Sequence, residues 1–140
     1  MNQVIDLQIR SLQHVGIPVV NIKASEDFYK KLGFTNVMQA VFKHKEEEGT
    51  CVMMKRGEII IELYQMPATE LQAIAARPDG HVDHIAFDVP DIDQAFLTLK
   101  TAGFAIIEDA PVFLQFWKKG CRYFNILGPN NERLEFNQVL

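Results

Sequence analysis

The sequence predicts an α+β fold made of two tandem modules, each a strand, a helix and three further strands. Two repeated patterns support this prediction. Residues 12–17 (LQHVGI) return as residues 82–87 (VDHIAF), and residues 60–65 (IIELYQ) return as residues 133–138 (RLEFNQ). The His residues of the first pair lie 70 residues apart, and the Glu residues of the second pair lie 73 apart. We interpret the chain as a duplication in which each copy starts with a His-bearing strand and ends with a Glu-bearing strand.

The middle parts of the two copies match as well. Residues 32–34 (LGF) correspond to residues 102–104 (AGF), and Cys51 corresponds to Cys121, both at an offset of 70. Chance could supply any one of these matches, but their shared order and spacing favour duplication. Two Cys are too few for a disulfide framework, so we interpret them as buried strand residues without a chemical role.

The first module shows the expected order of elements. Alternating apolar residues predict a strand over 12–19, and helical spacing predicts a helix over 23–32 that ends at Gly33. Charged or Gly-containing turns then separate three predicted strands, over 36–43, 50–56 and 59–65. The predicted apolar face of the helix comprises Phe28, Tyr29 and Leu32.

The second module repeats this order. A strand is predicted over 82–89 and a helix over 91–102, with Asp91 as its N-cap and Gly103 as its end. The apolar stripe of this helix comprises Ala95, Phe96 and Leu99. Three strands are predicted near 104–108, 121–126 and 133–138, with a turn at residues 129–131 (PNN) before the last one.

The linker between the modules, residues 66–81, is predicted to carry a short helix. Its start at residues 69–72 (TELQ) fits a capping box led by Thr69. We therefore expect a single domain over 1–140, made of a module at 12–65, this linker, and a module at 82–138.

Composition excludes several classes of partner. The net charge is −4 and there is no basic block, so nucleic acid is not an expected ligand. No stretch approaches the ~18 consecutive apolar residues of a membrane span. The N-terminus lacks the apolar core of a signal peptide, so we expect a cytoplasmic protein whose partner is a small-molecule substrate.

Strand alternation places the repeated His and Glu on one side of the predicted sheet. In the strand over 82–89, Ile85 and Phe87 share one face and His84 lies on the other. The same alternation separates His14 from Val15 and Ile17 in the first module. We expect the helices to cover the apolar face, so that the His and Glu side chains point into a concave surface on the other side.

Two imidazoles and two carboxylates on such a surface indicate a divalent-metal site formed by His14, Glu62, His84 and Glu135. Taken singly, each of these residues has an ordinary structural interpretation. Together they would bury two carboxylates among apolar neighbours, which is unfavourable unless a cation pairs with them. A set of two nitrogen and two oxygen ligands without thiolate suits one Ni²⁺, Co²⁺, Zn²⁺, Mn²⁺ or Fe²⁺ ion with open positions for substrate. We expect His44 and His81, which have no repeat partner, to be exposed.

These residues resemble the vicinal oxygen chelate superfamily, which includes glyoxalase I, methylmalonyl-CoA epimerase, extradiol dioxygenases and the fosfomycin and bleomycin resistance proteins. The resemblance rests on the His and Glu residues above and on the segments 28–34 (FYKKLGF) and 127–135 (LGPNNERLE). It implies two βαβββ modules that form a curved eight-stranded sheet around one metal. It also implies that His14, Glu62, His84 and Glu135 are the ligands, within one chain or between two chains of a dimer.

A full set of four ligands is similar to glyoxalase I and to the epimerase. The resemblance therefore implies a metal-dependent lyase or isomerase of the glyoxalase I type (lactoylglutathione lyase), which abstracts a proton next to a carbonyl with Glu135 as the preferred base and Glu62 as its counterpart. Glyoxalase I typically has an Arg four residues after its first His, whereas this chain has Pro18, which argues against glutathione as the thiol.

Three alternatives remain. An epimerase of the methylmalonyl-CoA type would need a second base, for which one of Glu46, Glu47 and Glu48 is a candidate, although this block is more simply a charged hairpin end. An extradiol-type dioxygenase would use O₂ and three protein ligands, without an equivalent of Glu62. A drug-binding resistance protein would bind an aromatic compound without metal.

A homodimer is the expected assembly, because an open sheet leaves edges that need covering. An apolar cluster after Pro111, formed by Phe113, Phe116 and Trp117, is a candidate packing or dimer surface. The alternative for this cluster is a lid over the substrate.

Overall fold

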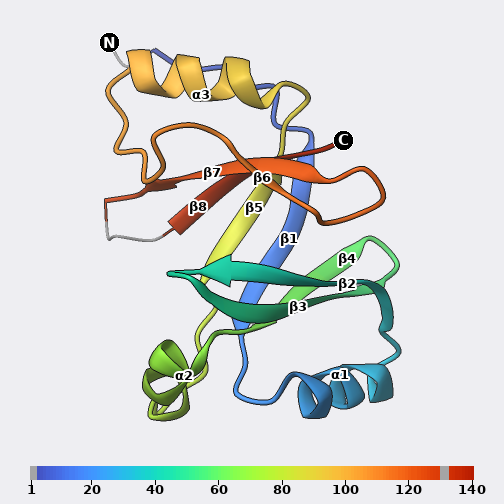
Figure 1. The fold of residues 1–140 in the computed structure, drawn as a ribbon. Helices are drawn as coiled ribbons and strands as arrows, with labels where there is room; N and C mark the ends of the chain where they lie inside the picture. The colour runs from blue at the N-terminus through green and yellow to red at the C-terminus, as the bar shows by residue number, and fades with distance from the viewer. Residues whose placement is uncertain (1–2, 130–132) are drawn as a thin grey trace. The chain divides into compact units, whose positions relative to one another are not determined.

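A computed structural model describes residues 3–129 and 133–140. The chain divides into two compact units. One, unit 1, holds the described residues up to Gln13 and those from His84 onwards; the other, unit 2, spans His14–Asp83. Figure 1 shows a helix beside the strands of each unit. No helix in the described part of the chain is long and apolar enough to cross a membrane.

Unit 2 contains the first βαβββ module and the linker helix. Its strands are hydrogen-bonded in the order β2-β3-β4-β1, with β1 parallel to β4 and the other pairs antiparallel. The elements are β1 (Ser11–Pro18, whose first three residues belong to unit 1), α1 (Ile22–Lys31), β2 (Thr35–His44), β3 (Glu47–Arg56), β4 (Ile59–Gln65) and α2 (Ala68–Ala75).

The core of unit 2 lies between its strands and α1. Val52, Met54 and Leu63 form this core together with Val19, and Ile22 and Tyr29 of α1 pack against it. Phe28 and Leu32, predicted on the same apolar helix face, are instead about half exposed. The packed face of α1 is therefore narrower than the sequence predicted.

Unit 1 contains the second module, with strands in the order β5-β8-β7-β6. Its elements are β5 (His84–Asp88), α3 (Ile92–Thr101), β6 (Val112–Leu114), β7 (Cys121–Leu127) and β8 (Arg133–Val139). The predicted apolar stripe of α3 is confirmed. Ala95 and Leu99 are buried against Phe124, Ile126 and Phe136 of the strands. The ring of Phe96 meets that of Phe124 edge to face at 5.2 Å.

The two modules start their helices with equivalent contacts. Asn21 caps α1 by accepting a hydrogen bond from the Ala24 N–H, and Asp91 caps α3 in the same way, as predicted. The repeated Gln of each closing strand adds a second contact, because Gln65 Oε1 accepts from Ile22 N–H and Gln138 Oε1 accepts from Ile92 N–H, both at 2.9 Å. Part of the repeated sequence is thus explained by helix initiation rather than by a site.

The fold class predicted from the sequence is confirmed, because the described residues form eight strands in two βαβββ modules. One predicted strand is wrong: residues 104–108 make a single bridge, between Ile106 and Ile126, and the short strand β6 follows at Val112–Leu114. The strand does not form because the Asn125 N–H donates to the Glu108 side chain at 2.6 Å. In a continued antiparallel pair, this N–H would donate to a backbone carbonyl of the segment 104–108.

The predicted capping box of the linker helix is also wrong. Helix α2 begins at Ala68 with Pro67 as its N-cap, and no side chain caps it. Thr69 lies inside the helix, and its hydroxyl donates to Glu47 Oε2 at 3.0 Å. The Thr69 hydroxyl, which the local sequence pattern predicted to cap the helix, is therefore used in a long-range contact instead.

Three further predictions concern the two Cys residues, the apolar cluster after Pro111 and a turn. Cys51 and Cys121 are buried in strands, as expected. Of the apolar cluster after Pro111, Phe116 is buried and Phe113 is about half exposed. The turn predicted at residues 129–131 falls largely outside the described residues.

Candidate metal centre and active site

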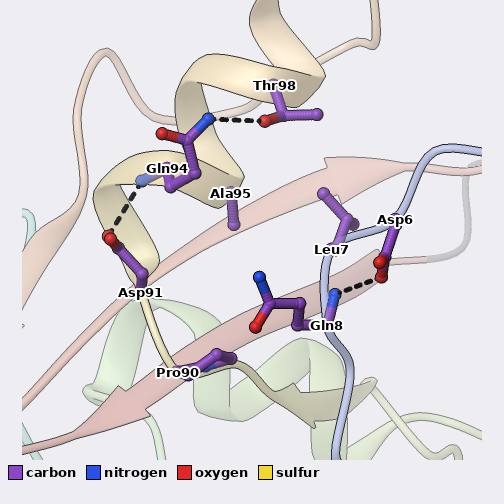
Figure 2. Close-up of a pocket in the computed structure, with 8 residues that line it drawn as sticks. All are labelled: Asp6, Leu7, Gln8, Pro90, Asp91, Gln94, Ala95 and Thr98. Carbon is purple, nitrogen blue, oxygen red and sulfur yellow. Dashed lines mark hydrogen bonds between the residues drawn. The ribbon is translucent and has the colours of Figure 1, made fainter.

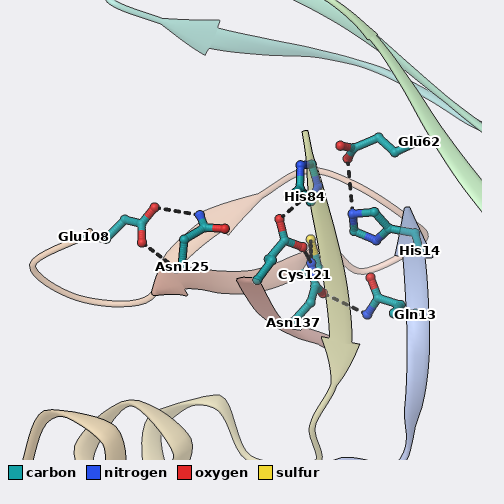
Figure 3. A network of polar contacts seen from close by, with 9 residues as sticks. Gln13, His14, Glu62, His84, Glu108, Cys121, Asn125 and Asn137 are labelled. Carbon is teal, nitrogen blue, oxygen red and sulfur yellow. Dashed lines mark hydrogen bonds and ion pairs between the residues drawn. The ribbon is translucent and has the colours of Figure 1, made fainter. Parts of the chain in front are cut away.

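In unit 2, His14 on β1 and Glu62 on β4 form a buried pair. His14 Nε2 lies 3.8 Å from Glu62 Oε2, and both side chains are almost inaccessible to solvent (Figure 3). In the strand register Glu62 stands between Gly16 on β1 and Met53 on β3. Its register partner on β1 therefore has no side chain, and its partner on β3 is apolar.

In unit 1, His84 on β5 and Glu135 on β8 form the equivalent pair. His84 Nε2 lies 3.5 Å from Glu135 Oε1, and both side chains are buried. Asn137 Nδ2 donates a hydrogen bond to the other carboxylate oxygen, Oε2, at 2.9 Å. Gln13 in turn donates to Asn137 Oδ1 at 3.1 Å (Figure 3). The setting of Glu135 is therefore more polar than that of Glu62.

Each pair lies on the strand face that its own helix does not cover. In unit 1 the neighbours of Glu135 along the strand, Leu134 and Phe136, pack on the side of α3. In unit 2 the neighbours of Glu62, Ile61 and Leu63, pack with the core beneath α1. The sequence prediction that helices cover the apolar faces is confirmed within each unit.

The separations within both pairs fit metal ligands better than direct hydrogen bonds. An N–H···O hydrogen bond joins atoms about 2.7–3.2 Å apart, and both pairs are longer than this. Two ligand atoms bound to one ion by bonds of about 2.0–2.2 Å stand roughly 3–4 Å apart, which brackets both separations. The donor atoms, imidazole nitrogen and carboxylate oxygen, are those of a divalent transition metal. The residues present therefore fit such an ion.

The other sequence candidates lie away from these pairs. His81 is exposed, and Glu46, Glu47 and Glu48 occupy the exposed end of the β2–β3 hairpin, as their charge predicted. His44 is only partly exposed, contrary to expectation, because its Nε2 lies 3.0 Å from Glu70 Oε1. Burial raises the pKa of the Glu70 carboxyl, but hydrogen bonds from His44 and Lys45 outweigh this effect and leave the pKa below its usual value.

Strand alternation already places Asn137 on the same face as Glu135, and the structure adds the hydrogen bond between them. Two further polar residues, Asn125 and Glu108, were not identified from the sequence. Asn125 stands opposite Glu135 in the β7–β8 register. Glu108 accepts two hydrogen bonds from Asn125 but lies in a segment that was predicted as a strand, so its role had no sequence signal.

A small pocket elsewhere in unit 1 has no features of a reactive site. It lies between the N-terminal residues Asp6–Gln8 and the start of α3 (Figure 2). Its polar groups are used locally: Asp6 accepts from the Gln8 N–H, and Asp91 accepts from the Gln94 N–H. We therefore assign this pocket to helix packing.

Comparison with known proteins supports the family predicted from the repeat. The family model described as "Glyoxalase/Bleomycin resistance protein/Dioxygenase superfamily" matches residues 11–136. The chain is 31% identical over 131 residues to the uncharacterized protein YwbC of Bacillus subtilis (strain 168), covering 92% of this chain and 98% of that protein.

Solved structures agree at the level of the fold. Methylmalonyl-CoA epimerase from Mycobacterium tuberculosis matches with a TM-score of 0.78 at 16% identity, covering 99% of this chain and 93% of that chain. A hypothetical protein from Bacillus halodurans C-125 matches with a TM-score of 0.73 at 23% identity, covering 93% and 94%. At these identities the likeness establishes the fold and leaves the reaction open.

Proposed function

Because this chain belongs to the Glyoxalase/Bleomycin resistance protein/Dioxygenase superfamily, we propose that it is a metal-dependent lyase or isomerase of the glyoxalase I type. Its reaction moves a proton at the carbon next to a carbonyl. The observation that carries this proposal is the pair of buried His–Glu contacts at equivalent positions of the two modules.

In this proposal His14, Glu62, His84 and Glu135 hold one divalent ion. When bound, a divalent ion supplies Lewis-acid polarisation of the substrate carbonyl, which makes the adjacent C–H more acidic.

The protein's own contribution is the proton transfer. Glu135 is the proposed base, because its carboxylate has polar neighbours and a fixed amide donor at Oε2. Glu62, whose register partner on β3 is Met53, is the proposed counterpart of Glu135. Return of the proton to the neighbouring carbon gives a glyoxalase I-type product, and return to the same carbon gives an epimer.

The second candidate, an epimerase of 2-acyl thioesters, is favoured by the fold shared with methylmalonyl-CoA epimerase over nearly the whole chain. Both candidates begin with the same proton abstraction, so one experiment tests what they share. The protein is purified without chelators or a His-tag, and its metal content is measured by mass spectrometry. Exchange of the substrate α-hydrogen is then followed in deuterated water.

Suitable probes are the hemithioacetals of methylglyoxal with glutathione and with coenzyme A, together with methylmalonyl-CoA. We expect about one metal equivalent per chain and exchange that stops when a chelator removes the metal. Oxygen consumption with a catechol would instead support a dioxygenase. Metal-free protein that still binds an aromatic drug would support sequestration, and either result would overturn the proposal.

A further inference from the structure

Asn125 is a buried residue whose side chain is held in one orientation. It lies on β7 with only 5% of its surface exposed. Its backbone N–H donates to Glu108 Oε1 at 2.6 Å, and its side-chain Nδ2 donates to Glu108 Oε2 at 2.9 Å. Because an ionised carboxylate can only accept hydrogen bonds, the Asn125 nitrogen must face Glu108 and the oxygen Oδ1 must face away.

The outward-facing oxygen is an unsatisfied acceptor. Asn125 Oδ1 is buried and has no hydrogen-bond partner among the described residues. Figure 3 shows it on the side of the amide away from Glu108, toward the region where His84 lies. Buried acceptors without a partner are rare in native proteins, because the group has lost its water without replacement.

The position of Asn125 connects it with the proposed base. Asn125 is the register partner of Glu135, with its neighbours Phe124 and Ile126 packed on the α3 side. Its side chain thus lies on the same strand face as Glu135. The equivalent register partner of Glu62 in the first module is Met53. The fold therefore does not require a polar group at this position.

We propose that Asn125, oriented by Glu108, is a specificity-determining residue whose Oδ1 accepts a hydrogen bond from a neutral donor on the substrate. This donor is a hydroxyl next to the reacting carbon or an amide N–H of the thiol portion. This inference rests on the proposed function, which places the reacting carbon at Glu135. The carboxylates of Glu108 and Glu135 flank Asn125, so a substrate carboxylate is disfavoured at this position.

A conservative change at Glu108 tests this role without altering the residue that faces the substrate. In Glu108→Gln, the new side-chain oxygen still accepts the Asn125 N–H, and the new amide nitrogen must donate to Asn125. The Asn125 amide therefore turns over and presents Nδ2 in place of Oδ1. Both internal hydrogen bonds remain, so the unfolding temperature should stay close to that of the wild type, while a donor on the substrate meets another donor.

The matching double variant restores the acceptor. With Glu108→Gln and Asn125→Asp together, the amide introduced at position 108 donates to one oxygen of the new carboxylate, and the second oxygen faces the substrate. The total charge of the pair is that of the wild type. Asp93→Asn is the control for loss of one carboxylate, because Asp93 pairs with Arg122 on the exposed surface of the same unit.

The probes are the S-lactoyl and S-propionyl thioesters of glutathione and of coenzyme A, which differ within each pair only by the 2-hydroxyl. Dissociation constants are measured by titration calorimetry. For a hydroxyl donor, we expect Glu108→Gln to weaken binding of the lactoyl thioesters by about 10-fold or more. Propionyl binding should be unchanged, Asp93→Asn should have no effect, and the double variant should recover much of the loss. An equal loss for both thioesters would assign the donor to an amide N–H of the thiol portion.

Each remaining outcome counts against the inference or against the function on which it rests. Unchanged affinity of Glu108→Gln for every probe, at an unchanged unfolding temperature, would overturn the inference. Failure of the wild type to bind any of the four thioesters would do the same. If Glu108→Gln binds the thioesters more weakly but the wild type never exchanges a substrate α-hydrogen, the proposed function is refuted and the role of Asn125 stands. If the wild type exchanges the substrate α-hydrogen and Glu108→Gln binds every thioester as tightly as the wild type does, only the role of Asn125 is refuted.

Discussion

Asn137 donates a hydrogen bond to Glu135 Oε2 from two positions along the same strand, at 2.9 Å. This contact holds one carboxylate oxygen in place while the other, Oε1, lies 3.5 Å from His84 Nε2. The carboxylate is thus oriented by the strand that carries it. The equivalent carboxylate, Glu62, has Gly16 and Met53 as its cross-strand neighbours. The two modules therefore place equivalent carboxylates in different surroundings, and we propose distinct roles for them.

The first prediction concerns Glu135. In Glu135→Gln an oxygen ligand remains, and the group loses the ability to take a proton. We expect metal content to stay near the wild-type value while α-hydrogen exchange in deuterated water falls by about 10²-fold or more. Glu62→Gln is the matched variant. If Glu62→Gln abolishes exchange and Glu135→Gln does not, the two roles must be exchanged, and if neither has an effect the proton-transfer mechanism is wrong.

The second prediction concerns the two His residues that we propose as metal ligands. His14 and His84 lie on the strand faces opposite the helix-covered cores, so removing either imidazole leaves both apolar clusters intact. We expect His14→Ala and His84→Ala to lose bound metal, measured by mass spectrometry, while circular dichroism remains that of the wild type. His81→Ala is the control, since His81 is exposed and should keep full metal content. Normal metal retention by either ligand variant would remove that residue from the site.

The third prediction concerns pH and the contact between the β2–β3 hairpin and α2. Burial raises the pKa of the Glu70 carboxyl, but the hydrogen bonds that it accepts from His44 and Lys45 outweigh burial and hold the pKa below its usual value of 4.5. A carboxyl with a lowered folded-state pKa stabilises the fold above its unfolded-state pKa, and this stabilisation is lost as the pH falls through the folded-state pKa.

We therefore expect Glu70→Gln to unfold at a lower temperature than the wild type near pH 7, and this difference to shrink as the pH falls below the usual carboxyl pKa of 4.5. Differential scanning calorimetry near pH 7 and at acidic pH measures the effect. Glu58→Gln serves as control, because Glu58 is exposed in the turn between β3 and β4. A difference between Glu70→Gln and wild type that persists unchanged at the lower pH would show that the contact acts through packing rather than charge.

The fourth prediction is a homodimer. The strands β2 and β6 each have only one hydrogen-bonded neighbour among the described strands. On these strands Val37, Val41 and Phe113 are substantially exposed. Exposed edges with apolar side chains favour pairing with a second chain. Light scattering at micromolar concentration should give twice the chain mass of 16.0 kDa. A monomer under these conditions would contradict the prediction, and Val41→Lys should shift a genuine dimer of this kind toward monomer.

Much of the fold was accessible from the sequence because a duplicated pattern gives the same information twice. The boundaries of β4 matched the predicted range, and Asp91 and Gly103 marked the ends of α3 as expected. The errors occurred where a distant side chain competes with a local pattern. Thr69 was assigned to a capping box, but its hydroxyl is taken by Glu47, and the predicted strand over 104–108 gives way where Glu108 takes the Asn125 N–H.

The sequence by itself determined the two-module architecture and which face of each strand carries His14, Glu62, His84 and Glu135, because the side-chain period of a strand is 2 and the apolar residues must face a helix. Only the tertiary structure decided the cross-strand neighbours of each carboxylate and the orientation of the Asn125 amide. Strand register and the path of the loop bring Glu108 and Asn125 together from 17 positions apart. The side-chain periodicity of a single strand cannot predict such a contact.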